Sequence, residues 1–345
     1  MTKFSFMDDY SEGCHPDILA AMAETNMSQQ SAYGVDEYSN QARALIHEHL
    51  KNAASEIFFV AGGTLANLTL MSSLLRSHEA IISVRRGHIA THETGAIEAV
   101  GHKIITVETQ DGKLNPVLVE AAVAANSMAP HMAKPRLVYI SNATETGRIY
   151  TKAELEALSK TCRKLDLLLF LDGARLGVAL ASLDNDVTLS DIARLTDVFW
   201  IGGTKAGALI GEAIVINRPE LAVDFRYHIK QRGALLAKGR LLGLQFRELF
   251  DKNLFVAASC HANSLATKLS EAIQSAGYEL ASGTQTNQVF PILPNKIVEK
   301  IEADFGFYRW ETHGSDHTCI RLVTSWATPV EQVDRFISQI WVVES

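Results

Sequence analysis

Short runs of consecutive hydrophobic residues recur through the first two thirds of the chain, separated by stretches with a helical hydrophobic period. A strand that is apolar on both faces is typical of a parallel sheet covered by helices on both sides. The pattern therefore predicts an α/β fold around a mostly parallel, seven-stranded sheet. The runs are Ile57–Val60, Ile81–Val84, Ile104–Val107, Leu137–Ile140, Leu167–Leu171, Val198–Ile201 and Ala213–Ile216.

Two helix starts are encoded locally. Thr151 and Glu154 have the spacing of a capping box, in which each side chain satisfies a backbone amide of the first turn. Hydrophobic residues then fall on one face of the predicted helix: Leu155, Leu158, Cys162 and Leu165. Asn115 followed by Pro116 predicts a second start, because proline suits the first helical position.

The hydrophobic pattern changes near residue 245, where two longer helical patterns are followed by strand-like segments at Val289–Leu293 and Ile320–Thr324. This mixture predicts a smaller α+β domain. We expect residues 1–245 to form an N-terminal segment with a large ligand-binding domain, and residues 246–345 to form the small C-terminal domain.

Composition narrows the function classes. The net charge of −7 and a pI near 6.0 argue against a nucleic-acid partner, which needs a clustered basic face. The four cysteines lie far apart, without zinc spacing or a disulfide framework. The first residues lack the apolar stretch of a secretory signal, and no segment has the length of a membrane helix. We therefore expect a cytoplasmic protein that does not bind membranes.

A lysine follows one of the buried strands in a loop of small residues, Gly202–Gly207. A partly desolvated lysine has a lowered pKa, which favours the neutral amine that forms Schiff bases. Lys205 is thus a candidate for binding pyridoxal phosphate, and Thr204 offers a hydroxyl to its phosphate. The plain alternative is a surface loop lysine.

A carboxylate and a guanidinium follow the most apolar strand. Ligands of open α/β sheets bind at the carboxyl ends of the strands, where Asp172 lies. Asp172 could pair with a protonated pyridine nitrogen and keep the ring an electron sink. Arg175 could donate to a cofactor oxygen or a substrate carboxylate. The alternative is a helix-capping aspartate with a surface arginine.

The glycine turn Gly62–Gly63–Thr64 precedes a helical pattern, so its amides and the helix dipole form a candidate anion site. It matches neither a Walker A loop nor a dinucleotide fingerprint. His88 and His92 are spaced as metal ligands would be on a helix, but the glutamate is not placed as in H-E-x-x-H and no further ligands cluster nearby. We expect an imidazole that stacks on an aromatic cofactor instead.

With these residues in place, the chain resembles the threonine aldolase family of fold-type I pyridoxal-phosphate enzymes, close to the tryptophanase-like β-eliminating lyases. The resemblance spans nearly the whole chain and implies the transferase-like fold of that class. It rests on Tyr33–Asp36, Gly62–Thr64, His88 with Glu93, Asp172–Arg175, Gly203–Lys205 and Arg321–Trp326.

The resemblance implies a role for each matching residue. Lys205 would form the Schiff base, His88 would stack on the pyridine ring, and Asp172 would pair with its nitrogen. Arg175 would lie by the phenolic oxygen and the substrate carboxylate, and Arg321 would clamp that carboxylate. Gly62, Gly63, Thr64 and Thr204 would surround the phosphate. An active site between subunits, and hence a homodimer or homotetramer, is also implied.

The chain departs from the family pattern in two places. Asp8 stands where the family often has a serine that holds the substrate carboxylate, so Ser11 is an alternative for that role. An arginine that reaches the phosphate from a neighbouring subunit is expected where Lys238 stands. Lysine keeps the charge but loses the bidentate geometry, and Arg240 is a candidate to compensate.

The implied reaction is carbon–carbon cleavage of L-threonine or L-allo-threonine type β-hydroxy-α-amino acids to glycine and an aldehyde, which makes the chain a lyase. We favour His88 over His92 or a bound water as the base for the β-hydroxyl proton. The same residues could instead carry β-elimination from another amino acid. A scaffold without turnover and a nucleotide-binding oxidoreductase are weaker alternatives, because the lysine, the aspartate and the glycine turn are all present and the dinucleotide fingerprint is missing.

Overall fold

The seven hydrophobic runs all form strands of one sheet in the computed structural model, which describes residues 3–341. The strand order is β2-β8-β7-β6-β5-β3-β4; β8 runs antiparallel to both its neighbours and the other pairings are parallel. The expected mostly parallel α/β sheet is therefore confirmed. The strands are β2 Glu56–Val60, β3 Glu79–Val84, β4 Lys103–Val107, β5 Lys134–Ser141, β6 Leu168–Asp172, β7 Val198–Gly202 and β8 Glu212–Ile216.

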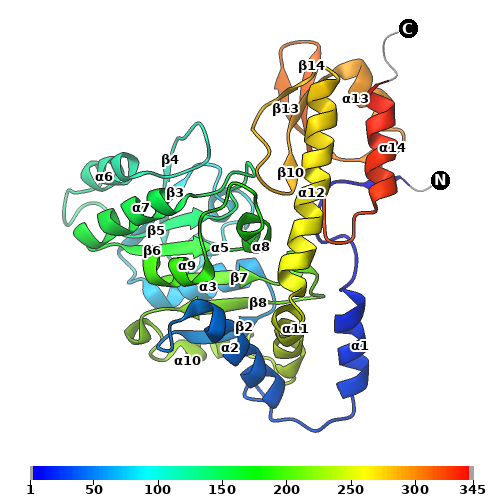
Figure 1. Cartoon of the computed structure of the whole chain (residues 1–345). Coiled ribbons are helices and arrows are strands. Elements are labelled where there is room, and N and C mark those ends of the chain that lie inside the picture. The colour runs from blue at the N-terminus through cyan, green and yellow to red at the C-terminus, as the bar shows by residue number, and fades with distance from the viewer. Residues whose placement is uncertain (1–2, 342–345) are drawn as a thin grey trace.

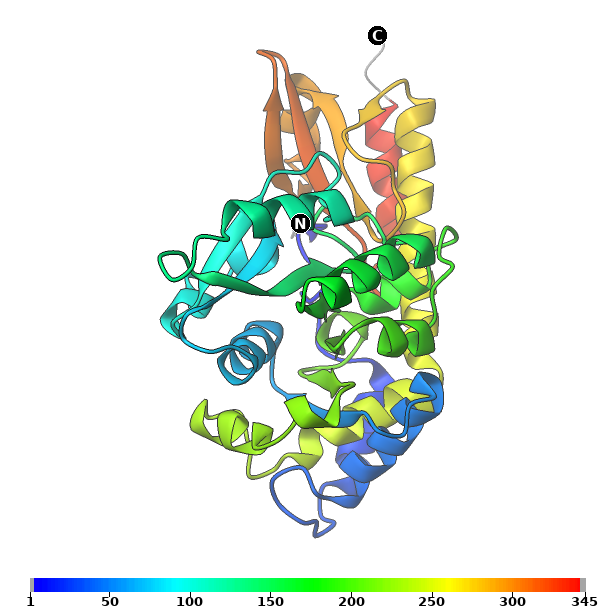
Figure 2. The same cartoon turned by 90° about the vertical axis from the view of Figure 1, so that its left-hand side faces the viewer.

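Both faces of the sheet are covered by helices (Figures 1 and 2). Successive residues of a strand point to opposite faces, so Leu137 and Val138 of β5 lie in two different core clusters. One face packs against α2 Glu37–Leu50, α7 Lys152–Lys164, α9 Leu189–Leu195 and α11 Arg240–Asp251. The other packs against α3 Gly63–Leu74, α5 Ala96–Ala99 and α10 Phe225–Gln231.

The C-terminal part of the described chain forms a third hydrophobic cluster around strand β14, His317–Val323, which pairs antiparallel with three other strands. The long helix α12, Leu254–Ser275, runs from the sheet to this region (Figure 1). The cluster also contains Phe6, because β1 (Phe4–Ser5) pairs with β12 (Phe305–Gly306). The domain boundary near residue 245 stays a prediction.

The predicted helix starts are both present. Thr151 accepts from the Glu154 amide and Glu154 accepts from the Thr151 amide, so α7 begins with the expected capping box. Asn115 caps α6, which begins at Pro116. The remaining elements are α1 Pro16–Thr25, α4 His88–Thr91, α6 Pro116–Ala125, α8 Leu176–Leu180, α13 Asn295–Ile301, α14 Val330–Ile340, β9 Glu279–Leu280, β10 Gln288–Val289, β11 Pro291–Pro294, β13 Tyr308–His313, and 3₁₀ turns at Thr204–Ala206 and Pro219–Leu221.

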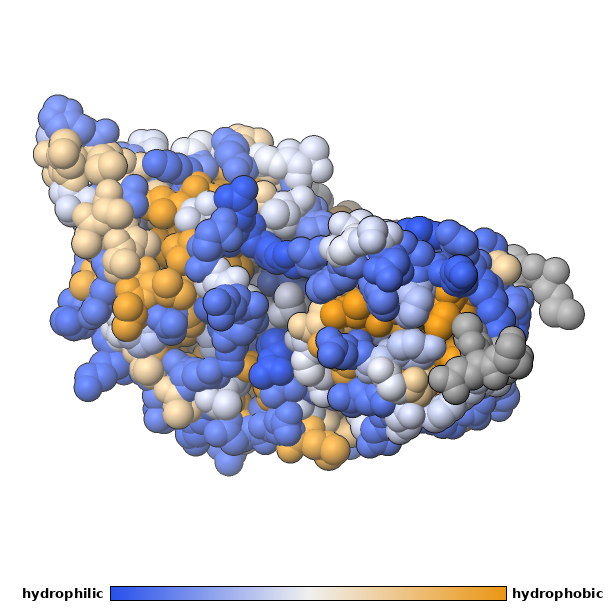
Figure 3. Space-filling view, turned by 90° about the horizontal axis from the view of Figure 1, so that it is seen from above, coloured by the Kyte–Doolittle hydropathy of each residue, from blue (hydrophilic) through white to orange (hydrophobic). Residues whose placement is uncertain are grey.

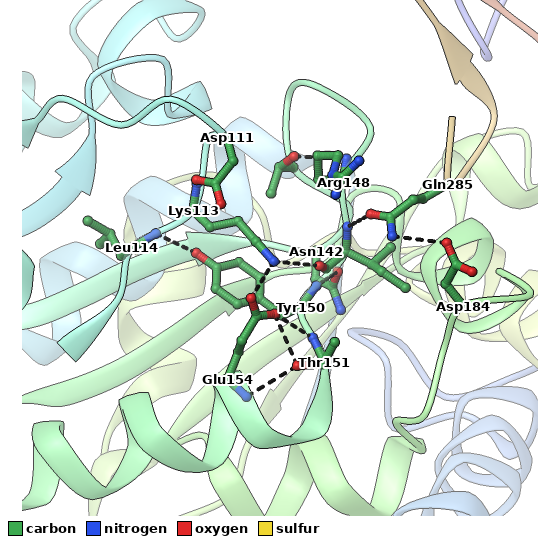
Figure 4. A network of polar contacts seen from close by, with 12 residues as sticks. Asp111, Lys113, Leu114, Asn142, Arg148, Tyr150, Thr151, Glu154, Asp184 and Gln285 are labelled. Carbon is green, nitrogen blue, oxygen red and sulfur yellow. Dashed lines mark hydrogen bonds and ion pairs between the residues drawn. The ribbon is translucent and has the colours of Figure 1, made fainter. Parts of the chain in front are cut away.

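A polar network fixes the loop between β5 and α7 (Figure 4). Lys113 donates to Glu154 at 2.5 Å and to the Ile149 carbonyl at 3.3 Å. Gln285 accepts from the Ile149 amide at 3.1 Å, which ties the loop to the C-terminal part of the chain. The loop thereby holds Glu145, four residues beyond the end of β5, in a defined position.

The surface is largely hydrophilic on the face seen in Figure 3, and the four cysteines form no disulfide. Figure 3 looks down on the molecule and shows hydrophilic residues over most of this face, with hydrophobic residues gathered in separate patches. The free cysteines are Cys14, Cys162, Cys260 and Cys319. Among residues 3–341, no helix is both long enough and apolar enough to span a membrane.

Candidate active site

The sheet edge at the carboxyl ends of β2, β3, β6 and β7 gathers the candidate residues. A cavity of about 130 Å³ is lined there by Gly63, Thr64, Asn67, His88, Asp172, Ala174, Trp200, Thr204, Lys205 and Glu212. A larger cavity of about 360 Å³ beside α2, α8 and α11 is lined mainly by apolar side chains. Because the lysine and the aspartate lie together in the smaller cavity, that one is the candidate active site.

Lys205 follows β7 in a tight turn. Burial lowers the pKa of its ammonium and the charge of Arg175 lowers it further, while Asp9, Asp172 and Glu212 oppose the shift. The turn needs Gly203, because a Cβ there would lie 2.7 Å from the Gly211 carbonyl oxygen. The sequence thus places an amine of lowered pKa at the sheet edge, as expected.

Asp172 ends β6 and has a buried carboxylate with three donors. They are the Tyr139 hydroxyl at 2.5 Å, the Ala174 amide at 2.9 Å and the Asn67 side-chain amide at 3.1 Å. Trp200 Nε1 donates to Asn67 Oδ1 at 3.1 Å and so fixes the orientation of that amide. Burial and the charge of Asp172 raise the pKa of Tyr139, which therefore remains a donor.

His88 begins α4, after β3, and its Nδ1 lies 2.8 Å from Glu93 Oε1. Glu93 also accepts from Asn67 at 2.7 Å, which links His88 to Asp172 through two side chains. His92 stacks beside His88 with ring centroids 5.6 Å apart, and burial followed by the charge of His88 lowers its pKa. Among the described residues no group of three metal-ligating side chains occurs.

The glycine turn lies at the N-terminus of α3, and its role as an anion site stays a prediction. Gly62 is the N-cap and provides no side-chain cap, so the first amides of α3 are left without an intrahelical acceptor. A Cβ on Gly63 would lie 2.8 Å from Trp200 Cη2, so glycine allows the turn to pack against the indole. Gly63 and Thr64 line the cavity that Lys205 also lines.

Two arginines belong to the electrostatic surroundings of the site, because the charge of Arg175 acts on both Lys205 and Arg321. Arg175 forms a bidentate ion pair with the buried Asp9, at 2.7 and 3.0 Å, and Asn287 donates to the same carboxylate at 2.9 Å. Arg321 donates to the Met7 carbonyl at 3.1 Å and stacks on two aromatic rings, those of Tyr308 and Trp310. Its Nε is buried and has no hydrogen-bond partner within the described part of the chain.

The residues at the two departures from the family pattern lie differently. Asp8 Oδ1 is 3.7 Å from Arg321, and Ser11 is exposed, so the structure brings Asp8 and not Ser11 to an arginine. Lys238 is exposed just before α11. Arg240 is engaged elsewhere, because it donates to the Ser28 and Thr25 carbonyls.

Sequence reasoning missed several polar residues that the structure places at the site. Asp9 adjoins Asp8, but its ion pair joins residues 166 positions apart. Glu145 accepts from the His88 amide at 3.0 Å and from Ser141 at 2.8 Å, and burial raises its pKa. Tyr139 and Glu212 left a signal in the sequence, since Tyr139 lies within the apolar run Leu137–Ile140 and Glu212 directly precedes the run Ala213–Ile216. The sequence did not show what either side chain contacts.

Comparison with known proteins places the chain in a family. The family model described as beta-eliminating lyase matches residues 7–295. The chain is 34% identical over 340 residues to the low specificity L-threonine aldolase of Pseudomonas aeruginosa, covering 97% of this chain and 96% of that protein. It is 35% identical over 343 residues to the same enzyme of a Pseudomonas species, with coverage of 98% and 97%.

Solved structures agree. A Leishmania major threonine aldolase superposes with a TM-score of 0.96 at 47% identity, covering 98% of both chains. An aspartate aminotransferase of Thermus thermophilus, with a TM-score of 0.72 at 16% identity over 99% of this chain and 92% of that one, shares the fold. The expected fold-type I architecture is thus confirmed, and the chain belongs to the beta-eliminating lyase family and, within it, to the threonine aldolases.

Proposed function

We propose that this chain cleaves L-threonine and L-allo-threonine type β-hydroxy-α-amino acids to glycine and an aldehyde, using pyridoxal phosphate held at Lys205. The observation that carries the proposal is that one cavity is lined by Lys205, Asp172, His88 and the open first turn of α3. The relatives named threonine aldolase support the same reaction.

The residues present fit pyridoxal phosphate. Lys205 has a lowered pKa, which favours the neutral amine that attacks an aldehyde. Asp172 offers a fixed carboxylate for a protonated ring nitrogen, and the amides of α3 offer donors for a phosphate. When bound, the cofactor would supply an electron sink for the pair of electrons left on Cα.

Arg321 is the best placed group for the substrate carboxylate. Its Nε is buried and has no acceptor among residues 3–341. The Cζ atom of the guanidinium lies 4.8 Å from the ring centroid of Tyr308 and 5.1 Å from that of Trp310. A buried donor without an acceptor is costly, so an incoming carboxylate would be favoured. Arg175 is already paired with Asp9 and would act mainly through that rigid pair.

His88 is placed to move the β-hydroxyl proton. Glu93 accepts from Nδ1, which leaves Nε2 as the basic nitrogen. The carboxylate of Glu93 is fully buried, whereas the imidazole is 40% exposed and can reach a ligand. The sequence-based preference for His88 over His92 stays a prediction.

Self-association into a homodimer or homotetramer is part of the proposal. Tyr33 and Tyr227 are 42% and 76% exposed, and Arg226 donates to the Tyr33 carbonyl, so two exposed aromatic side chains come from neighbouring segments. Large exposed aromatic residues are enriched at protein interfaces. Lys238 is exposed and lies next to Ala237, whose carbonyl accepts from the Tyr33 amide. We infer that this lysine is available to a second subunit.

The test is chemical. We expect the purified protein to be yellow, and borohydride followed by digestion and mass spectrometry to place a pyridoxyl group on Lys205. Threonine should then give glycine and acetaldehyde in equal amounts. A keto acid with ammonia would indicate β-elimination instead, and a protein that stays unlabelled with added pyridoxal phosphate would contradict the proposal.

A further inference from the structure

A buried carboxylate lies where a phosphate is expected. Glu212 begins β8 and pairs in register with Gly202 of β7 and Val60 of β2, the strands that lead into the lysine turn and the glycine turn. Glu212 is 5% exposed and lines the same cavity as Thr64 and Lys205. An ionised carboxylate at this point would repel a phosphate that binds between the two turns.

The hydrogen bonds of Glu212 also engage the hydroxyl expected to hold that phosphate. Glu212 Oε2 accepts from the Gly203 amide at 3.0 Å, and Oε1 accepts from Thr204 Oγ1 at 3.1 Å. The Gly211 amide donates to Thr204 Oγ1 at 3.2 Å. A hydroxyl has one proton, so Thr204 cannot donate to a phosphate while it donates to Glu212.

A proton on Glu212 reverses this arrangement. The protonated Oε1 can donate to Thr204 Oγ1, which then accepts two bonds and no longer gives its own proton to Glu212. A phosphate oxygen then competes for that proton only with the Gly211 carbonyl oxygen, at the long distance of 3.5 Å. Oε2 continues to accept from Gly203, so neither backbone nor side chain has to move. Protonation also removes the negative charge that faces the anion.

The surroundings of Glu212 make protonation accessible near neutral pH. Burial raises the pKa of Glu212 to about 7; Lys205 opposes the rise, and the charge of Asp172 adds to it. The neighbouring strand residues Gly202 and Val60 carry no charge. Among the described residues, Lys205 and Asp172 are the charged side chains that change the pKa of Glu212 most.

We propose that Glu212 is a proton switch of the phosphate site. When Glu212 is uncharged, the Thr204 hydroxyl can donate to a phosphate monoester; when Glu212 is ionised, that hydroxyl donates to the Glu212 carboxylate instead. The inference rests on the proposed function, because it takes the cofactor phosphate as the ligand. Binding of the phosphate then takes up one proton at Glu212 from solvent when the site starts ionised.

The probe is pyridoxine 5′-phosphate, which has the phosphate but no aldehyde and so cannot react with Lys205. Its dissociation constant is measured by calorimetry on cofactor-free protein from pH 6 to 9, in two buffers of different ionisation enthalpy to count protons. Glu212→Gln is the matched variant, because its amide can donate to Thr204 and accept from Gly203 as the protonated acid does. Glu79→Gln, at another buried carboxyl outside the cavity, is the control.

We expect E212Q and the unmodified chain to bind the probe alike at pH 6, and E212Q to bind roughly tenfold more tightly at pH 8, one unit above the pKa of Glu212. Proton uptake at pH 8 should be lower in E212Q by up to about one proton. In a Thr204→Val background the advantage of glutamine should fall to about threefold or less, since the released hydroxyl is gone.

Equal pH dependence in E212Q and the unmodified chain would overturn the switch, and an undiminished advantage with Thr204→Val would overturn its route through Thr204. Thermal unfolding of each variant shows whether the fold is intact. If pyridoxal phosphate still labels Lys205, such a result rejects the switch alone. A chain that binds neither compound at any pH rejects the proposed function as well.

Discussion

At the scale of single residues, the ion pair of Asp9 with Arg175 combines stability with positioning of the site. Asp9 is 1% exposed, and replacing it by asparagine leaves the guanidinium without its counter-charge. We expect Asp9→Asn to lower the free energy of unfolding at pH 7 by about 3 kcal/mol. Urea unfolding measures this, and Asp316→Asn at an exposed carboxylate is the control, with a change near zero.

The contribution of Asp9 to the free energy of unfolding should depend on pH. Burial raises the pKa of Asp9, but the charges of Arg175 and Lys205 outweigh burial and hold it below its ordinary value of 3.8. A carboxyl with a lowered folded-state pKa stabilises fully above the unfolded-state value and loses that contribution as the pH falls through the folded-state value. The difference between Asp9→Asn and the unmodified chain should therefore shrink below about pH 4. A difference that is constant from pH 7 to pH 3 would contradict this account.

Replacing Asp8 should change the KM for threonine. Its carboxylate is 3.7 Å from the guanidinium of Arg321 and would compete with the carboxylate of an amino acid. We expect Asp8→Ser to lower the KM for threonine by about three- to tenfold, with kcat little changed. Asp8→Glu keeps the charge and should keep the KM. An increase in KM with serine would show that Asp8 positions Arg321 for the substrate.

At the scale of elements, two capping boxes offer a matched pair. Thr151 caps α7 and Thr188 caps α9, and each hydroxyl accepts a hydrogen bond from the backbone amide three residues further on. We expect Thr151→Ala and Thr188→Ala each to cost about 1 kcal/mol in unfolding free energy and to leave the KM for threonine unchanged. A loss of activity with either variant at full stability would show that the cap does more than hold its helix.

The two boxes also show what the sequence could reveal. Thr151 with Glu154 has the standard spacing and residue types and was predicted, whereas Thr188 pairs with an aspartate, Asp191, and was not singled out. The sheet strands were predictable because each is a run of apolar residues. The pairing of β1 with β12 was not, because each strand has two residues and about 300 positions separate them.

The candidate site divides in the same way. Residues at the ends of apolar strands or directly after them, such as Asp172 and Lys205, could be found because the carboxyl edge of the sheet is where ligands bind. Asp9 and Glu212 could not be assigned, since their roles depend on partners that the fold brings close. Local chemistry therefore identified the groups expected to touch the cofactor, and tertiary contacts identified the groups that set their charge and orientation.

At the scale of the whole molecule, the proposed contact of Lys238 with the phosphate site of a neighbouring subunit implies that each active site draws on two subunits. Lys238→Ala should weaken binding of pyridoxal phosphate because one cation near the phosphate is lost, while Lys205→Ala should abolish turnover. Unfolded and refolded together, the two variants form mixed dimers. One of the two sites in a mixed dimer then combines an intact Lys205 with an intact Lys238 from the other subunit.

If Lys238 serves the neighbouring site, mixing should restore activity at limiting pyridoxal phosphate, up to about one quarter of the unmodified level when half of the dimers are mixed. If Lys238 serves its own subunit, every site retains at least one of the two defects and mixing restores nothing. Mixing Lys205→Ala with Lys160→Ala, an exposed lysine on α7, calibrates the expected dilution. Because the two arrangements predict opposite results from the same sample, the assay decides whether the functional unit is one chain or two.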